Sequence, residues 1–139
     1  MLLPEKDDPD VYVIRADFSN AGGWQAICRA IRESLNEDGM KVQFIEDRDF
    51  DGASPQDLLP VLEGNPFYSF AFIIDGVSIE SPEFPILVLD LLTEPGRTFR
   101  VIPSNVGNVH ANLWLANMDF EDYADSVDPD GVFRGFAES

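Results

Sequence analysis

The sequence has 139 residues, of which 45% are apolar, so it is long enough for one hydrophobic core and too short for two ordinary domains. Its 26 acidic and 9 basic residues give a formal net charge of −17, so direct binding to nucleic-acid phosphate or to anionic lipid membranes is disfavoured. A single cysteine excludes an internal disulfide, and we find neither a secretory signal nor an apolar run of membrane length, so we expect a cytoplasmic protein.

The beginning of the chain predicts a leader, a strand and a long helix. Residues 1–10 are polar, contain two prolines and predict a flexible leader, so that residues 11–139 form the single domain. Residues 11–18 are β-branched and aromatic, a composition typical of a strand. Apolar side chains then recur at three- and four-residue steps over 21–37, which indicates one stripe of a helix that Gly39 ends.

A second strand and a short helix follow. Residues 41–45 predict the strand, and 46–52 predict a charged loop. Ser54 is followed by proline and, three residues on, by an aspartate, which is typical of a helix start. We expect Pro60 to interrupt this helix and residues 64–66 to close it.

The middle of the chain predicts the centre of a sheet. Residues 67–74 and 86–92 are apolar at nearly every position, as in strands buried on both faces, and 75–85 connects them with one helical turn. Residues 94–97 have Pro and Gly at the central positions of a type II turn, so 98–102 is predicted to run antiparallel to the strand before it.

The last part of the chain predicts smaller elements. We expect a helix over 104–111, a short strand over 113–116, a helix over 118–127, and a tail over 132–136 that packs its two rings on the body. The whole order predicts an α/β fold, or its α+β variant, with a single mixed sheet of five to six strands and three to four helices.

Two familiar kinds of site are disfavoured by the residue types present. The chain has one cysteine, Cys28, on the apolar stripe of the predicted helix, and one histidine, His110, so a Cys-His nucleophile is unexpected. A zinc site needs three or four Cys or His ligands, and the sequence has only one of each, so we predict no zinc site. The acidic run 46–51 lacks the complete pattern of a calcium loop, so we predict no metal site there.

Three aspartates lie at or near the ends of predicted strands: Asp17, Asp75 and Asp90. Carboxylates that converge at the C-terminal edge of a parallel sheet can hold Mg²⁺ for phosphoryl transfer or hydrolysis. No glycine-rich phosphate loop accompanies them, Asp75 fits an ordinary turn, and Asp17 fits a helix cap. A Mg²⁺-dependent enzyme with these three catalytic residues is therefore the second hypothesis.

Asp90 also interrupts an apolar strand, and a buried carboxylate needs a partner. A structural ion pair is the favoured interpretation, because such pairs are common where a carboxylate is buried. The candidate partners are Arg15, Arg97 and Arg100.

Acidic and aromatic residues are densest over 119–133, and a second acidic group lies at 46–51. Carboxylates steer a basic protein and rings supply buried anchors, so these segments predict a docking surface for a basic protein. The same pattern is also typical of a solvated amphipathic helix whose rings belong to the core, and acidity alone keeps a protein soluble. The candidate binding residues are Asp47, Asp49, Asp51, Asp119, Phe120, Glu121, Asp122, Tyr123 and Asp125.

Residues 94–101, 116–124 and 130–136 resemble an uncharacterised family of small acidic bacterial proteins, a domain of unknown function, and the likeness begins at 15–18. This resemblance implies a bacterial cytosolic origin and no particular reaction. The terminal strand followed by Asp-Phe-Glu-Asp-Tyr is also similar to the ending of several toxin-immunity domains. The first hypothesis is therefore a non-enzymatic interaction protein, an immunity-type or inhibitory partner of a basic protein such as a nuclease, that uses no cofactor.

Overall fold

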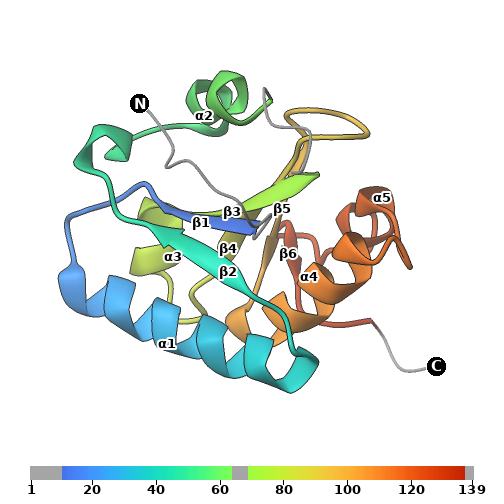
Figure 1. The fold of residues 1–139 in the computed structure, drawn as a ribbon. Coiled ribbons are helices and arrows are strands. Elements are labelled where there is room, and N and C mark those ends of the chain that lie inside the picture. Colours follow the sequence, from blue (N-terminus) through green and yellow to red (C-terminus); the bar gives the residue numbers. More distant parts are fainter. Residues whose placement is uncertain (1–10, 64–68, 137–139) are drawn as a thin grey trace.

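Six strands form one mixed sheet, as the computed structural model shows for the residues that it describes, 11–63 and 69–136 (Figure 1). Its order is β2-β1-β3-β4-β5-β6, with β1, β2 and β3 parallel, β4 antiparallel to its neighbours, and β6 parallel to β5. The predicted α/β class and mixed sheet are confirmed. The strands are β1 (Val11–Arg15), β2 (Val42–Ile45), β3 (Phe70–Ile74), β4 (Ile86–Asp90), β5 (Thr98–Val101) and β6 (Val132–Phe133).

Helices cover both faces of this sheet (Figure 1). α1, α4 and α5 pack on one face around a core rich in rings, and α2 packs on the other face around aliphatic side chains. The helices are α1 (Ala21–Asp38), α2 (Pro55–Leu62), α3 (Gly76–Glu80), α4 (Val106–Trp114) and α5 (Phe120–Ala124), with single 3₁₀ turns η1 (Arg48–Phe50) and η2 (Pro103–Asn105).

The long helix α1 follows its sequence signals closely. The Asn20 side chain accepts the N–H of Gly23 and begins the helix, and Gly39 ends it with φ of +69°, a left-handed conformation that glycine adopts without strain. The apolar stripe of α1 is buried on the sheet. The boundaries predicted for this helix are confirmed.

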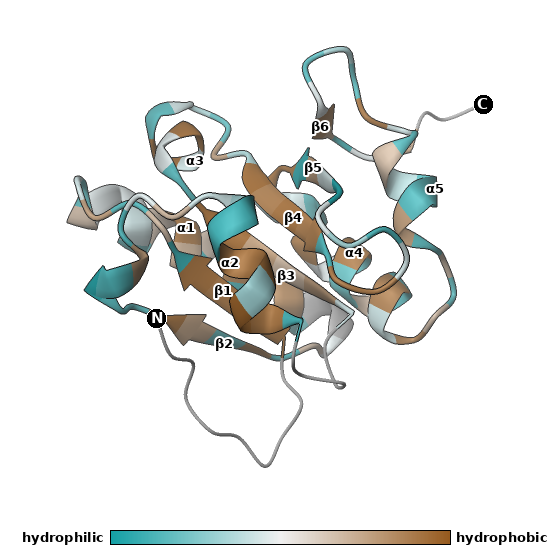
Figure 2. Cartoon of the chain, turned by 90° about the horizontal axis from the view of Figure 1, so that it is seen from above, coloured by the Kyte–Doolittle hydropathy of each residue, from teal (hydrophilic) through white to brown (hydrophobic). Residues whose placement is uncertain are grey.

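The two predicted central strands are also confirmed. Every residue of β3 and of β4 is buried, and the two strands pair in the middle of the sheet. Figure 2 shows β1, β3 and β4 as the hydrophobic centre of the molecule. The turn between β4 and β5 has the predicted form, since Arg97 N–H donates to Glu94 O at 2.9 Å and Gly96 has φ of +100°.

Two predictions about smaller elements are wrong, and one strand was not predicted. Pro60 does not interrupt α2, which continues to Leu62, and the predicted closing residues 64–66 lie outside the described residues. Residues 113–116 form no strand, because Leu113 packs on the core as part of α4 and the chain then turns. The tail packs its two rings on the body as predicted, with Phe133 buried and Phe136 in contact with Tyr123. The tail also contains the unpredicted strand β6, which pairs with β5, and the N–H of Arg100 donates to Gly131 O at 3.0 Å. A two-residue strand is too short to show a periodic pattern.

Candidate interaction site

The three strand-end aspartates do not meet. β1 and β3 are parallel, so Asp17 and Asp75 leave the sheet at the same end, and Asp17 Oδ2 lies 3.1 Å from the place of a Cβ on Gly76. β4 runs in the opposite direction, and Asp90 pairs with Phe70 at the other end of β3. The predicted convergence is wrong, because the pattern of apolar runs does not reveal strand direction. Within residues 11–63 and 69–136, no cluster of three His, Cys, Asp or Glu side chains is arranged to hold a metal ion.

Asp75 has a structural role. Its carboxylate accepts two hydrogen bonds from Arg100, at 2.8 and 2.9 Å, and one from the N–H of Ser78 at 3.1 Å, which begins α3. Burial raises the pKa of Asp75, but the hydrogen bonds and charge of Arg100 outweigh burial, so the pKa lies below its ordinary value. An ionised Asp75 thus ties α3 to β5.

Asp90 is held by the backbone and not by an arginine. The side chain is almost fully buried, and its carboxylate accepts the N–H groups of Leu92 at 3.0 Å, Thr93 at 3.2 Å and Glu94 at 2.8 Å. The predicted ion pair is wrong: Arg15, Arg97 and Arg100 bind Glu46, Asp125 and Asp75. Asp90 therefore organises the β4–β5 turn as an Asx-type acceptor.

The two predicted acidic groups lie at opposite ends of the sheet. Asp47 accepts the N–H of Asp49 at the start of η1, and Asp51 accepts the N–H of Phe18 at 3.2 Å. Gly52 N–H donates to Ala16 O, so this loop sits beyond the C-terminal end of β1. Phe120 of α5 lines one cavity with Phe70, at the N-terminal end of β3, and β3 is parallel to β1, so the α5 group lies at the opposite end of the sheet.

The carboxylates and the rings of α5 face different ways. Asp119, Glu121, Asp122 and Asp125 are exposed. Phe120 is 5% exposed and Tyr123 is fully buried, with its hydroxyl 2.8 Å from Asn108 Oδ1. Phe133 is also fully buried. These rings are therefore not available as anchors for a partner, and the structure bears out the alternative interpretation, in which the rings of an amphipathic helix belong to the core.

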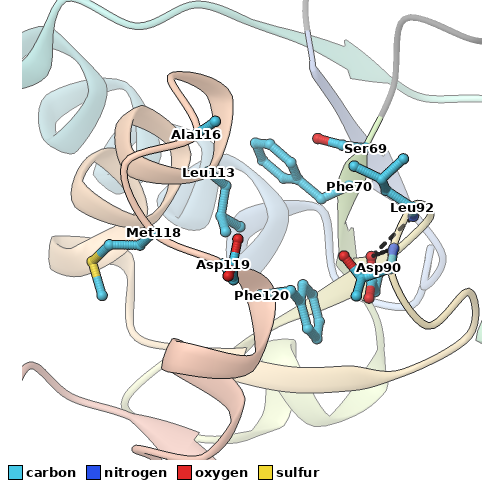
Figure 3. Close-up of a pocket in the computed structure, with 10 residues that line it drawn as sticks. Ser69, Phe70, Asp90, Leu92, Leu113, Ala116, Met118, Asp119 and Phe120 are labelled. Atoms are coloured by element: carbon cyan, nitrogen blue, oxygen red, sulfur yellow. Dashed lines mark hydrogen bonds between the residues drawn. The ribbon is translucent and has the colours of Figure 1, made fainter.

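A cavity of about 80 Å³ lies between the β4–β5 turn and the α4–α5 connection (Figure 3). Figure 3 shows the carboxylates of Asp90 and Asp119 and the rings of Phe70 and Phe120 around the same space. Its other lining residues are Ser69, Leu92, Thr93, Leu113, Ala116 and Met118. The cavity therefore combines apolar walls with two carboxylates. The adjacent surface exposes Leu92 by 71% and Leu115 by 59%.

Sequence reasoning found only part of this cavity. It selected Asp119 and Phe120 for binding and Asp90 for a different role, and it did not select Leu92, Leu113 or Met118. An aspartate at a strand end, just before a Pro-Gly turn, is a signal for backbone capping that could have identified the role of Asp90. No pattern joins residues 90–93 to 113–120, because the two segments meet only through tertiary packing.

Cys28 and His110 are both buried in the core. Burial raises the pKa of the Cys28 thiol to about 12, so the thiol stays protonated and unreactive at neutral pH. His110 lies beside the rings of Phe70 and Phe72, and its Nε2 is 2.9 Å from Lys41 O. Both residues therefore lie in the packed core, where they contribute to the fold.

The fold and the cavity define an α/β domain with a mixed six-stranded sheet and a small acidic, apolar cavity at one end of that sheet. Residues 10–136 match the model of a family described as a domain of unknown function, DUF6924, and the chain belongs to this family. The predicted membership of an uncharacterised family is confirmed. No curated protein matches the chain.

Two solved structures of prolyl-tRNA synthetase from Cryptosporidium parvum share the fold. The complex with L-proline and AMP gives a TM-score of 0.56 at 15% identity over 77% of this chain, and the complex with halofuginone and AMPPNP gives 0.57 at 14% over 84%. The matched part is 21% and 23% of those chains, so the chain spans less than a quarter of their length. Among the described residues, no helix is long and apolar enough to cross a membrane.

Proposed function

We propose that this chain is a non-enzymatic interaction domain that binds a basic partner protein at the cavity beside α5. The observation that carries the proposal is the combination of Asp90 and Asp119 with the apolar walls of one cavity. Lysine and arginine have an apolar stem and a cationic end, so a basic side chain of the partner matches both features. The exposed carboxylates of α5 steer such a partner toward the cavity.

The anchors in this proposal differ from the rings that the sequence suggested. Leu92 lines the cavity and is exposed, and the exposed Leu115 stands in the chain between the lining residues Leu113 and Ala116. These two side chains supply the contact area that Phe120 and Tyr123 cannot supply from the core. Acidic residues 47–51 lie at the other end of the sheet and do not take part. The binding surface is thus limited to residues near 90–93 and 113–125.

Within this proposal, the partner is a basic enzyme such as a nuclease, and the domain acts as an immunity-type inhibitor in the cytoplasm of a bacterium. The net charge of −17 supports a cationic partner, because it accelerates the encounter of opposite charges. A lone, buried and protonated cysteine is compatible with a reducing compartment.

The test is affinity capture from the source lysate with the wild-type chain and two matched variants. Leu92→Asp adds a charge at the cavity, whereas Val77→Asp adds the same charge to another exposed apolar position, on α3 at the opposite end of the sheet. We expect a basic protein that the wild type and Val77→Asp capture, that Leu92→Asp loses, and that high salt releases. Equal capture by both variants would exclude the cavity as the binding site.

A further inference from the structure

The basic residues of this acidic chain fall into two groups, one that forms ion pairs and one that does not. Eight of the nine basic residues lie in the described part of the chain. Arg15, Arg97, Arg100 and Arg134 form ion pairs. Within that part, Arg29, Arg32, Lys41 and Arg48 form none, and all four are exposed.

Three of these free cations lie along one groove. Arg29 and Arg32 line a hollow of about 380 Å³ beside α1, together with two carboxylates, Glu33 and Glu46, and Glu46 is already bound by Arg15 and by the indole N–H of Trp24. Arg32 and Lys41 line a second hollow of about 380 Å³ beside β2. Both hollows share Arg32 and Asn36, so they form one groove along the seam of α1 and β2, which we call the α1–β2 groove. Figure 1 shows these two elements next to each other.

The α1–β2 groove also has an apolar floor. The rings of Trp24 and Phe44 meet edge to face with centroids 6.1 Å apart, and the Arg32 guanidinium lies 4.6 Å above the Phe44 ring. Phe44 is only half-buried, as is Val42. This contact holds the Arg32 side chain over the groove, where its outer N–H groups remain available to a carboxylate.

β2 is an edge strand. Its neighbour in the sheet is β1, and in the described residues no strand pairs with its outer side. Alternate N–H and C=O groups of β2 therefore point outward, and such an edge is a template for another extended segment. The groove and the open edge lie side by side, since Val42 and Phe44 of β2 line the groove.

We propose that the α1–β2 groove binds an extended acidic segment of a partner protein, which adds as a strand to the outer edge of β2 and places its carboxylates against Arg29, Arg32 and Lys41. This site is independent of the cavity at α5, since the two share no lining residue. A short acidic peptide suits the groove better than nucleic acid does. Nucleic acid has no backbone donors for a strand edge, and it would extend over the surrounding acidic surface.

The experiment measures fluorescence polarisation of a labelled peptide of alternating glutamate and valine, about six residues long, the length of an ordinary strand. A peptide of alternating lysine and valine is the control for charge. Arg32→Glu is the test variant, and Arg48→Glu is its matched control, because Arg48 is also exposed and free of ion pairs but lines neither hollow. We expect about tenfold weaker binding for Arg32→Glu and an unchanged affinity for Arg48→Glu.

A second measurement tests the mode of binding. Hydrogen exchange of the outward amides of β2 should slow when the acidic peptide is added, and not when the lysine peptide is added. Arg29→Glu serves as the second variant if circular dichroism shows that Arg32→Glu is not folded. Equal losses for the Arg32 and Arg48 variants, tighter binding of a single-stranded oligonucleotide, or self-association that Arg32→Glu abolishes would each overturn the proposal.

Discussion

At the β6 edge of the sheet the arginines are bound by carboxylates of the same chain, whereas at the β2 edge they face solvent without one. Arg134 contacts Glu83, Asp128 and Asp130, and Arg97 contacts Asp125. Arg29, Arg32 and Lys41 at the β2 edge have no such partner in the described part of the chain. The number of charges in a segment therefore does not tell how many of them are available for a partner.

The rings differ between the two edges in the same way. At the β6 edge, Tyr123 lies between Phe99 and Phe133 and is fully buried. At the β2 edge, Phe44 is only half-buried beneath a cation. The edge that is most acidic and aromatic in sequence is thus the one whose rings and arginines the fold already uses.

The largest effect should come from breaking the ring cluster of the β6 edge. Tyr123→Ala removes a fully buried ring and its hydrogen bond with Asn108, so we expect a loss of about 3–5 kcal/mol in the free energy of unfolding. Urea denaturation measures this loss. Leu115→Ala is the control, because Leu115 is 59% exposed and should cost less than about 1 kcal/mol. Similar costs for the two variants would show that Tyr123 is not a core residue.

Local signals account for the parts of the fold that were predicted correctly. Asn20 and Gly39 bound α1, Ser54 begins α2, and the all-apolar runs at 70–74 and 86–90 form the sheet centre. These features depend on residues close in sequence, so composition and spacing reveal them. Strand direction depends on distant packing, and for that reason Asp90 was placed at the wrong end of the sheet.

The candidate site was less predictable for the same reason. Asp119 and Phe120 were identified from their segment, but the cavity also needs Leu92 and Leu113, which come from elsewhere in the chain. The free cations of the α1–β2 groove carry no sequence signal, because whether an arginine is paired depends on which carboxylates the fold brings to it. β6 was missed because two residues show no period.

A second prediction concerns Asp90, which organises the loop beside the cavity. Asp90→Ala leaves the N–H groups of Leu92, Thr93 and Glu94 without their acceptor, so we expect a loss of about 2–3 kcal/mol. Asp90→Asn retains one carbonyl acceptor and should cost less. Urea denaturation gives the stability, and hydrogen exchange of residues 92–94 shows whether the turn loosens. An unchanged turn in Asp90→Ala would contradict the capping role.

A third prediction uses the depressed pKa of Asp75. A carboxylate whose pKa is lower in the folded than in the unfolded state stabilises the fold above the unfolded value, and this contribution is lost as pH falls through the folded value. Asp75→Asn should therefore cost about 2 kcal/mol at pH 7 and progressively less below pH ~4. Unfolding midpoints measured between neutral and acidic pH give the two curves. Parallel curves for Asp75→Asn and the wild type would show that Asp75 is not ionised in its contact with Arg100.

The smallest expected effect is a change in melting temperature when an arginine is removed from either edge, and it compares the β6 and β2 edges directly. Carboxylates of Glu83, Asp130 and Asp128 raise the pKa of Arg134, and the hydrogen bonds from Arg134 lower the pKa of Glu83 and of Asp130. Arg134→Ala should thus lower the melting temperature slightly, and high salt should remove the difference because these groups are at the surface.

Arg29→Ala is the matched change at the β2 edge. Arg29 is exposed and forms no ion pair in the described part of the chain, so its removal breaks no such contact. The melting temperature of Arg29→Ala should therefore stay unchanged at low and at high salt. Differential scanning fluorimetry across a salt series compares the two variants. If Arg29→Ala lowers the melting temperature in the same salt-dependent way as Arg134→Ala, Arg29 is already bound within the chain, and the contrast between a closed and an open edge fails.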